Sequence, residues 1–208
     1  EAVQAGVTIE KIFALESHGD QLAAFPQTVW VSEEILLDLA DTQTPQGIVA
    51  VIQKEEVGPP DFSQGKFLFL EDVQDPGNVG TMIRTADAAG FTGVIVSDKS
   101  ADIYSLKTLR SMQGSHFHLP IYRMPLATFV EEAKKSNLPI LATTLSRESK
   151  DYRELSSLEN FVLVMGNEGQ GISSVMAESA DQLVHIGMKG RAESLNVAVA
   201  AGILMFYF

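Results

Sequence analysis

The hydrophobic positions of this chain fall into short apolar runs that are separated by polar or glycine-rich segments. From residue 66 onward these runs lack the strict alternation of a half-exposed strand, and segments with helical spacing lie between them. Such runs are typical of parallel strands that are covered on both faces. The pattern predicts strands at 67–70, 93–97, 139–143, 161–165 and 182–186, and helices near 79–89, 105–111, 126–136 and 195–207. We therefore expect an α/β fold with a parallel sheet.

The first part of the chain has the pattern of a separate, smaller α/β unit. It predicts strands at 12–15, 29–31 and 47–53 and a helix at 32–40 with Ser32 as its N-cap. The chain opens at Glu1 in what looks like the middle of a helix, so we expect that the true N-terminus precedes it.

The segment 54–65 carries two prolines and two glycines without apolar periodicity, which predicts a linker. The expected domains are therefore 1–53 and 66–208.

Composition narrows the class of protein. The 208 residues are 45% hydrophobic and 20% charged, which is ordinary for one large or two small globular domains. The absence of cysteine excludes disulfides and thiolate metal sites and allows a cytoplasmic location, which we take as the default. The four histidines show no metal-binding spacing, so we expect no metal. The longest apolar stretch, 195–208, is too short to span a membrane, so we expect no membrane insertion.

The net charge of −12 argues against holding nucleic acid by bulk electrostatics, because neutralising phosphates requires clustered Lys and Arg. Residues 1–60 carry ten acidic and two basic side chains, whereas residues 61–208 carry seventeen acidic and thirteen basic ones. Any RNA contact is therefore expected mainly in the second part, or in residues outside this chain.

Three segments, far apart in sequence, join an apolar run to a cluster of Gly, Pro or Asn. They are 67–84 (FLFLEDVQDPGNVGTMIR), 161–172 (FVLVMGNEGQGI) and 184–203 (VHIGMKGRAESLNVAVAAGI). Loops at strand ends are where α/β folds place ligands. The spacing G-x-x-G-x-G of Gly166, Gly169 and Gly171 differs from the dinucleotide-binding fingerprint G-x-G-x-x-G, so the segments indicate another kind of site.

Taken one at a time, these residues also have simpler interpretations. Asn78 is a good N-cap for the following helix, and Arg84, about 120° away around that helix, suits an exposed ion pair. Glu168 is either a solvated carboxylate or a group that orients Arg84 or a neighbouring loop. Ser194 suits the cap of the last helix, with Asn196 in its first turn.

Together, the segments resemble the three motifs of the SpoU (TrmH-like) family of RNA ribose 2′-O-methyltransferases, which belong to the SPOUT class. The resemblance rests on Asn78 followed by Arg84, the GNEGQG run from Gly166, and Ser194-Leu195-Asn196, and it covers about residues 66–208. It implies a C-terminal trefoil knot, a preceding small RNA-recognition domain similar to a ribosomal protein, and a homodimer.

The resemblance also implies the substrates and the site residues. The methyl donor would be S-adenosylmethionine and the acceptor a ribose 2′-hydroxyl of structured RNA, either rRNA or tRNA. The implied catalytic residues are Arg84, Asn78, Glu168, Ser194 and Asn196. The implied cofactor-binding positions are Gly166, Ile186 and Leu195, with Thr143, Asn167 and Met188 as neighbours.

The family assigns Arg84 the activation of the 2′-hydroxyl. Because a guanidinium keeps its proton at ordinary pH, we hypothesise instead that Arg84 binds the adjacent RNA phosphate and stabilises the developing alkoxide. One departure is Gly187, which stands where members usually carry proline and which is less pre-organised. The rival interpretations are a catalytically silent RNA-binding or ribosome-assembly factor on the same scaffold and, on fold class alone, a nucleotide-binding enzyme.

Overall fold

The computed structural model describes residues 1–40, 42, 44–54 and 56–208. Asp41, Gln43 and Glu55, which belong to the predicted first domain and linker, lie outside the described residues. The chain divides into two compact units, Glu1–Glu56 and Val57–Phe208, and the boundary falls inside the segment predicted as a linker.

The first unit is built on a three-stranded sheet of order β2-β1-β3. Its central strand pairs in parallel with β2 and antiparallel with β3. Its elements are β1 (Ile9–Ala14), a 3₁₀ turn (Glu16–His18), α1 (Gly19–Leu22), β2 (Thr28–Trp30), α2 (Glu33–Ala40) and β3 (Ile48–Ile52). A small apolar core of Ile12, Ala14 and Leu22 holds the sheet to α1.

The sequence predicted the three strands and the longer helix of this unit within a few residues. Ser32 lies just before α2, and its Oγ accepts a hydrogen bond from the backbone N–H of Ile35 at 3.4 Å, as expected of the predicted N-cap. Residues 2–6 form turns rather than the helix suggested by the opening of the chain, and the four-residue α1 was not predicted.

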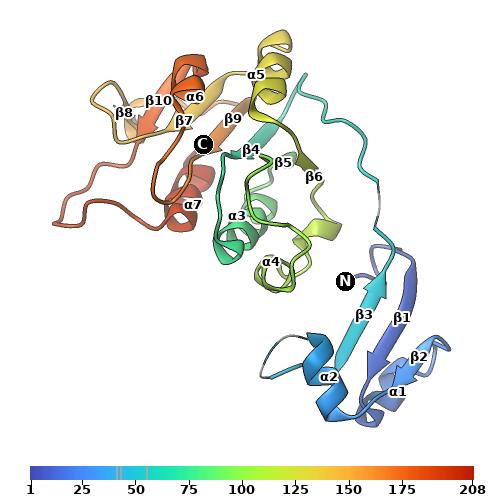
Figure 1. Ribbon diagram of the computed structural model, residues 1–208. Helices are drawn as coiled ribbons and strands as arrows, with labels where there is room; N and C mark the ends of the chain where they lie inside the picture. Colours follow the sequence, from blue (N-terminus) through green and yellow to red (C-terminus); the bar gives the residue numbers. More distant parts are fainter. Residues whose placement is uncertain (41, 43, 55) are drawn as a thin grey trace. The chain divides into compact units, whose positions relative to one another are not determined.

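The second unit contains a seven-stranded sheet of order β6-β5-β4-β9-β7-β10-β8, and its pairings are parallel (Figure 1). The strands are β4 (Lys66–Leu70), β5 (Gly93–Val96), β6 (Ile121–Arg123), β7 (Ile140–Thr143), β8 (Lys150–Asp151), β9 (Phe161–Met165) and β10 (Gln182–His185). The predicted α/β fold with a parallel sheet is thus confirmed.

Helices cover both faces of this sheet (Figure 1). They are α3 (Pro76–Ala88), α4 (Leu106–Met112), α5 (Leu126–Lys135), α6 (Ser174–Ser179) and α7 (Val197–Tyr207), with 3₁₀ turns at Ser115–Phe117 and Tyr152–Glu154. Alternate residues of β4 point to opposite faces: Leu68 and Leu70 pack with α3 and α7, whereas Phe67 and Phe69 pack with α5 and α6. The apolar runs therefore fill two cores, one on each face of the sheet.

Two helix starts differ from the prediction by more than one residue. Helix α3 begins at Pro76 rather than Val79, because proline is favoured in the first turn and Asp75 caps the helix by accepting from the N–H of Asn78 at 2.8 Å. Helix α7 begins at Val197 rather than Leu195. The short elements β6, β8 and α6 were not predicted, because two to six residues give too little periodicity.

No helix in the described ranges is long and apolar enough to cross a membrane. The last helix is apolar nearly all round, and one face of it packs on the sheet, with Ala198, Ala201, Leu204 and Met205 buried.

Candidate active site

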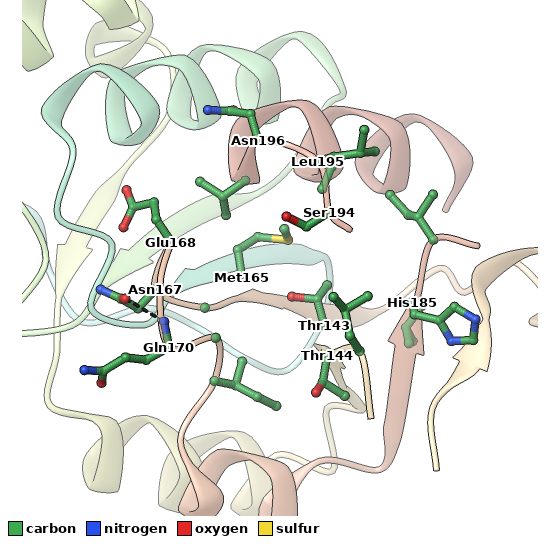
Figure 2. Close-up of a pocket in the computed structure, with 18 of the residues that line it drawn as sticks. Thr143, Thr144, Met165, Asn167, Glu168, Gln170, His185, Ser194, Leu195 and Asn196 are labelled. Carbon is green, nitrogen blue, oxygen red and sulfur yellow. Dashed lines mark hydrogen bonds between the residues drawn. The ribbon is translucent and has the colours of Figure 1, made fainter. Parts of the chain in front are cut away.

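A cavity of about 770 Å³ opens at the carboxyl ends of β7, β9 and β10 (Figure 2). The loops after these three strands form its walls, and the residues 194–196, just before α7, close it. The six predicted cofactor-binding positions all line it: Thr143, Gly166, Asn167, Ile186, Met188 and Leu195. Of the predicted catalytic residues, Glu168, Ser194 and Asn196 also line it. The parallel sheet thus brings the second and third motifs to one pocket.

The loop from Gly166 to Gly171 fixes its own shape. Asn167 and Gly171 exchange backbone hydrogen bonds of 3.0 and 2.9 Å, and Oδ1 of Asn167 accepts from the N–H groups of Gly169 and Gln170. A Cβ at position 166 would lie 2.3 Å from the carbonyl carbon of Gly171, so only glycine fits there. Since its side chain holds the loop, Asn167 contributes to the pocket mainly through backbone.

Glu168 ties this loop to the first motif. Its carboxylate accepts from the N–H of Gln74 at 3.2 Å, from the N–H of Asp75 at 3.1 Å and from Nδ2 of Asn78 at 3.2 Å. Partial burial raises the pKa of Glu168, but these donors together outweigh it and the pKa lies below its ordinary value of 4.5. Of the predicted roles, the contacts of Glu168 fit the orientation of a neighbouring loop, and no hydrogen bond or ion pair joins its described side chain to that of Arg84.

Asn78 and Asn196 extend the same chain of hydrogen bonds to the third motif. Nδ2 of Asn196 donates to Oδ1 of Asn78 at 3.0 Å, while Oδ1 of Asn196 accepts from the N–H groups of Ala198 and Val199. Asn196 is therefore the N-cap of α7, and the prediction that Ser194 caps this helix was wrong. The prediction that Asn78 caps α3 was also wrong, since Asp75 has that role and Asn78 uses its side chain to join Glu168 to Asn196.

Ser194 and Arg84 are the two predicted catalytic residues outside this hydrogen-bonded chain. The exposed Ser194 lines the pocket near Met165 (Figure 2). Arg84 lies exposed on α3 and is not part of the pocket wall. Within the described parts of the chain, neither side chain makes a hydrogen bond or an ion pair. Both therefore have polar groups available to a substrate.

Two supporting side chains were missed by the sequence analysis. Glu71, at the end of β4, is only 4% exposed, and its carboxylate accepts from the N–H of Ser173 just before α6 at 3.1 Å. An acid directly after the apolar run FLFL was the available signal.

His185 lines the far end of the pocket from Glu168 in Figure 2, and its Nδ1 lies 3.0 Å from Oγ of Ser149. Nothing in the local sequence marked that contact.

Thr143 supports the pocket in a different way from the one expected. Its Oγ1 donates to the carbonyl of Val164 at 2.9 Å, which joins the ends of β7 and β9. Across residues 1–40, 42, 44–54 and 56–208, no group of three or more His, Asp or Glu side chains is arranged to hold a metal ion.

A parallel sheet with helices on both faces and a pocket of three strand-end loops without a G-x-G-x-x-G fingerprint define an α/β protein whose ligand site differs from a dinucleotide-binding one. The chain belongs to the SpoU rRNA Methylase family, whose sequence profile matches residues 65–206.

Individual relatives agree with this assignment. The chain is 43% identical to 23S rRNA (guanosine(2553)-2'-O)-methyltransferase RlmP of Bacillus subtilis over 181 residues, which are 87% of this chain and 72% of that protein. Its fold matches the AdoMet-bound rRNA methyltransferase from Sinorhizobium meliloti with a TM-score of 0.87, 33% identity and coverage of 99% of this chain and 81% of the other. It also matches the SpoU methyltransferase AviRb from Streptomyces viridochromogenes in complex with AdoMet, with a TM-score of 0.83, 29% identity and coverage of 99% and 83%.

Proposed function

We propose that this protein transfers the methyl group of S-adenosylmethionine to a ribose 2′-hydroxyl of structured RNA, and that ribosomal RNA is its substrate. The observation that carries this function is the chain of side chains Glu168, Asn78 and Asn196, which joins the three family motifs around one pocket. Ribosomal RNA is favoured over transfer RNA because the 43% identical relative is named for 23S rRNA.

The pocket residues fit S-adenosylmethionine. Its volume of about 770 Å³ lies within the range that binds drug-sized ligands, and its wall combines backbone amides of the glycine loop with apolar side chains. Gly166, Ile186, Met188 and Leu195 supply this wall, Thr143 braces it, and Asn167 fixes the loop. When bound, S-adenosylmethionine supplies a methyl group on a positively charged sulfur.

The free polar groups suit the RNA side of the reaction. Arg84 is on the same helix as Asn78, and its guanidinium can bind a phosphate next to the target ribose in a bidentate manner. There it would stabilise negative charge that develops on the 2′-oxygen, while the proton passes to phosphate or water. We propose that Ser194 and Asn196, which line the pocket just before α7, contact the ribose.

We propose two further features that the family resemblance implies. The first is the trefoil knot, supported by the segment 184–197, which lines the same pocket as the loops 143–146 and 165–172. The second is a homodimer formed through α7, because Val199, Ile203 and Phe206 are exposed on the side away from the buried residues of this helix.

We propose that the first unit contributes to RNA recognition. We also propose that the protein acts in the cytoplasm. Support for the recognition role comes from the match to the Sinorhizobium meliloti enzyme, which extends over 99% of this chain and so includes this unit. Its excess of acidic residues limits it to contacts that do not depend on phosphate neutralisation.

The function is tested with methyl-labelled S-adenosylmethionine and separate pools of unmodified ribosomal and transfer RNA, followed by digestion to nucleosides. We expect label in a 2′-O-methyl nucleoside from ribosomal RNA. Arg84→Ala should abolish it and Arg84→Lys should not restore it, because lysine lacks the planar fork of donors. Lys134→Ala, which removes a charge from α5 on the other face of the sheet, is the matched control and should behave as wild type.

Each alternative has its own result. Label in transfer RNA alone would change the substrate. RNA binding without label in either pool would favour the catalytically silent factor. Near-normal transfer by Arg84→Lys would contradict the role of the guanidinium.

A further inference from the structure

The pocket wall at Ile186–Met188 has an unusual neighbour on its outer side. A Cβ at position 187 would lie 2.7 Å from Oδ2 of Asp151, closer than real side chains approach. The carboxylate therefore occupies the space that any side chain at this position would need. Glycine, which has no Cβ, leaves that space to the carboxylate.

Asp151 cannot easily move out of that space. Arg153 donates to it from Nε at 2.8 Å and from its terminal NH₂ group at 2.7 Å, and the backbone N–H of Arg153 adds a third bond at 3.1 Å. These donors hold the pKa of Asp151 well below its ordinary value, so the carboxylate is charged at neutral pH. A two-pronged contact of this kind fixes the orientation of the carboxylate plane.

The segment that carries Asp151 is itself attached to the sheet and to α7. Strand β8 pairs in parallel with β10, with Asp151 opposite His185. The Oγ of Ser149 lies 3.0 Å from Nδ1 of His185, and the hydroxyl of Tyr207 donates to the carbonyl of Arg153 at 3.3 Å. The segment that carries Asp151 is thus attached at three points beside the end of β10.

We propose that Asp151, held by Arg153, is a positioning residue for the methyl-donor pocket: its carboxylate packs against Gly187 and sets the backbone path of Ile186 and Met188, which line that pocket. This proposal rests on the proposed function of the site. The braced carboxylate restricts the wall before the ligand arrives and so reduces the ordering cost of binding.

The test is a double-variant cycle, with affinity for S-adenosylmethionine measured by titration calorimetry. Gly187→Ala should weaken binding about tenfold, since the new Cβ displaces either the wall or the carboxylate; no positive φ penalises alanine there. Asp151→Ala should weaken it about threefold, because the wall loses its support. The combination of both changes should bind more tightly than Gly187→Ala alone, since the alanine methyl then takes the vacated space.

Lys150→Ala on the same strand is the matched control and should bind as wild type. If Asp151 had a purely structural role, its variants would have lower melting temperatures, but the double variant would not bind S-adenosylmethionine more tightly than Gly187→Ala. The proposal is overturned if Asp151→Ala binds as tightly as wild type, or if the double variant is no better than Gly187→Ala.

Amide hydrogen exchange of residues 186–188 without ligand provides a second readout. Exchange there should be faster in Asp151→Ala than in wild type, and equal rates would contradict the positioning role. If wild type itself fails to bind S-adenosylmethionine, the proposed function of the pocket fails, while hydrogen exchange still decides whether Asp151 restrains the wall.

Discussion

Asn196 performs two tasks with one amide, and each task uses a different atom. Its Oδ1 caps α7, while its Nδ2 donates to Asn78 at 3.0 Å. Replacement by aspartate keeps an oxygen for the cap but turns the donor that faces Asn78 into an acceptor.

We therefore expect Asn196→Asp to lower kcat/KM for RNA methylation about tenfold or more, with a melting temperature close to that of wild type. Asn196→Ala should lose both tasks and should also destabilise the protein by about 1 kcal/mol. Steady-state kinetics and thermal unfolding measured on the same preparations separate the two effects. Equal kcat/KM for Asn196→Asp and wild type would show that the contact with Asn78 is dispensable.

The surroundings of Glu168 predict how binding of S-adenosylmethionine depends on pH. The pKa of Glu168 is lowered in the folded protein, so its contribution is fully present above the ordinary value of 4.5 and is lost as the pH falls through the lower folded pKa. Binding of S-adenosylmethionine should therefore not depend on pH above about pH 5, where Glu168 is fully charged, and should weaken below about pH 4.5 as the protonated carboxyl group releases the N–H groups of Gln74 and Asp75.

The check is a calorimetric titration series from pH 7 to pH 4 on wild type and Glu168→Gln. The glutamine variant should bind more weakly at neutral pH and should lack the acid-dependent step. Parallel pH profiles for the two proteins would assign the step to another group.

The motif residues could be predicted from the sequence, but their partners could not. The three segments were recognisable because glycine, proline and asparagine interrupt apolar runs at fixed spacings. The contact between Asn78 and Glu168 joins residues 90 positions apart, and it exists because β4 and β9 are neighbours in the sheet. The local pattern of apolar and polar residues does not show the order of the strands in the sheet. Cap identity failed for a related reason: Asp75 and Asn78, like Ser194 and Asn196, are pairs of residues that are equally suited to cap.

Helices α3 and α4 show how one glycine sets the position of the site. A Cβ at Gly80 would lie 2.6 Å from the carbonyl oxygen of Thr108 and 2.6 Å from Cβ of Ser111, so the two helices meet with backbone close to side chain. Helix α3 carries both Asn78 and Arg84, and its distance from α4 therefore depends on this residue.

Gly80→Ala should destabilise the protein by about 1–3 kcal/mol, because backbone atoms of α4 must shift to admit the methyl group. Chemical denaturation should show this as a lower midpoint with an unchanged slope. Gly202→Ala on α7 is the matched control, since its Cβ would meet only Cγ2 of Thr85 at an ordinary 3.7 Å. A stable Gly80→Ala protein would mean that α3 and α4 can separate without cost.

The long elements were predictable and the short ones were not, for a physical reason. Strand β9 and helix α3 are long enough for their buried positions to give a recognisable pattern of apolar residues in the sequence. Strand β8 has two residues, and it forms because β10 offers a free edge rather than because Lys150 and Asp151 favour extended backbone. Its position beside Gly187 nevertheless makes it the element that we propose as the support of the pocket wall.

The charged residues of the chain are distributed unevenly between its two units. The first unit carries a strong excess of acid, while most basic residues lie in the second unit with the pocket. Phosphate contacts should therefore be few, and the salt dependence of RNA binding should be shallow. Specificity must then come from shape and from contacts with bases or sugars.

Assembly gives the last prediction, because the exposed side of α7 begins beside the pocket. Val199, Ile203 and Phe206 follow the spacing of a single helical stripe, and Phe206 is 68% exposed. Burying such side chains in a second copy would contribute about 1.5–3 kcal/mol each. Since Asn196, which lines the pocket, caps α7, a partner seated on this stripe would also hold the pocket end of the helix in place.

Phe206→Glu should therefore convert a dimer to a monomer in sedimentation velocity. The monomer should also transfer methyl groups more slowly than wild type, even where its melting temperature shows that it remains folded. Val175→Glu, at an apolar position of α6 that is 53% exposed, is the matched control and should remain dimeric. A wild-type protein that sediments as a monomer at all concentrations would contradict the proposed homodimer. A Phe206→Glu protein that remains dimeric would place the interface elsewhere than on α7.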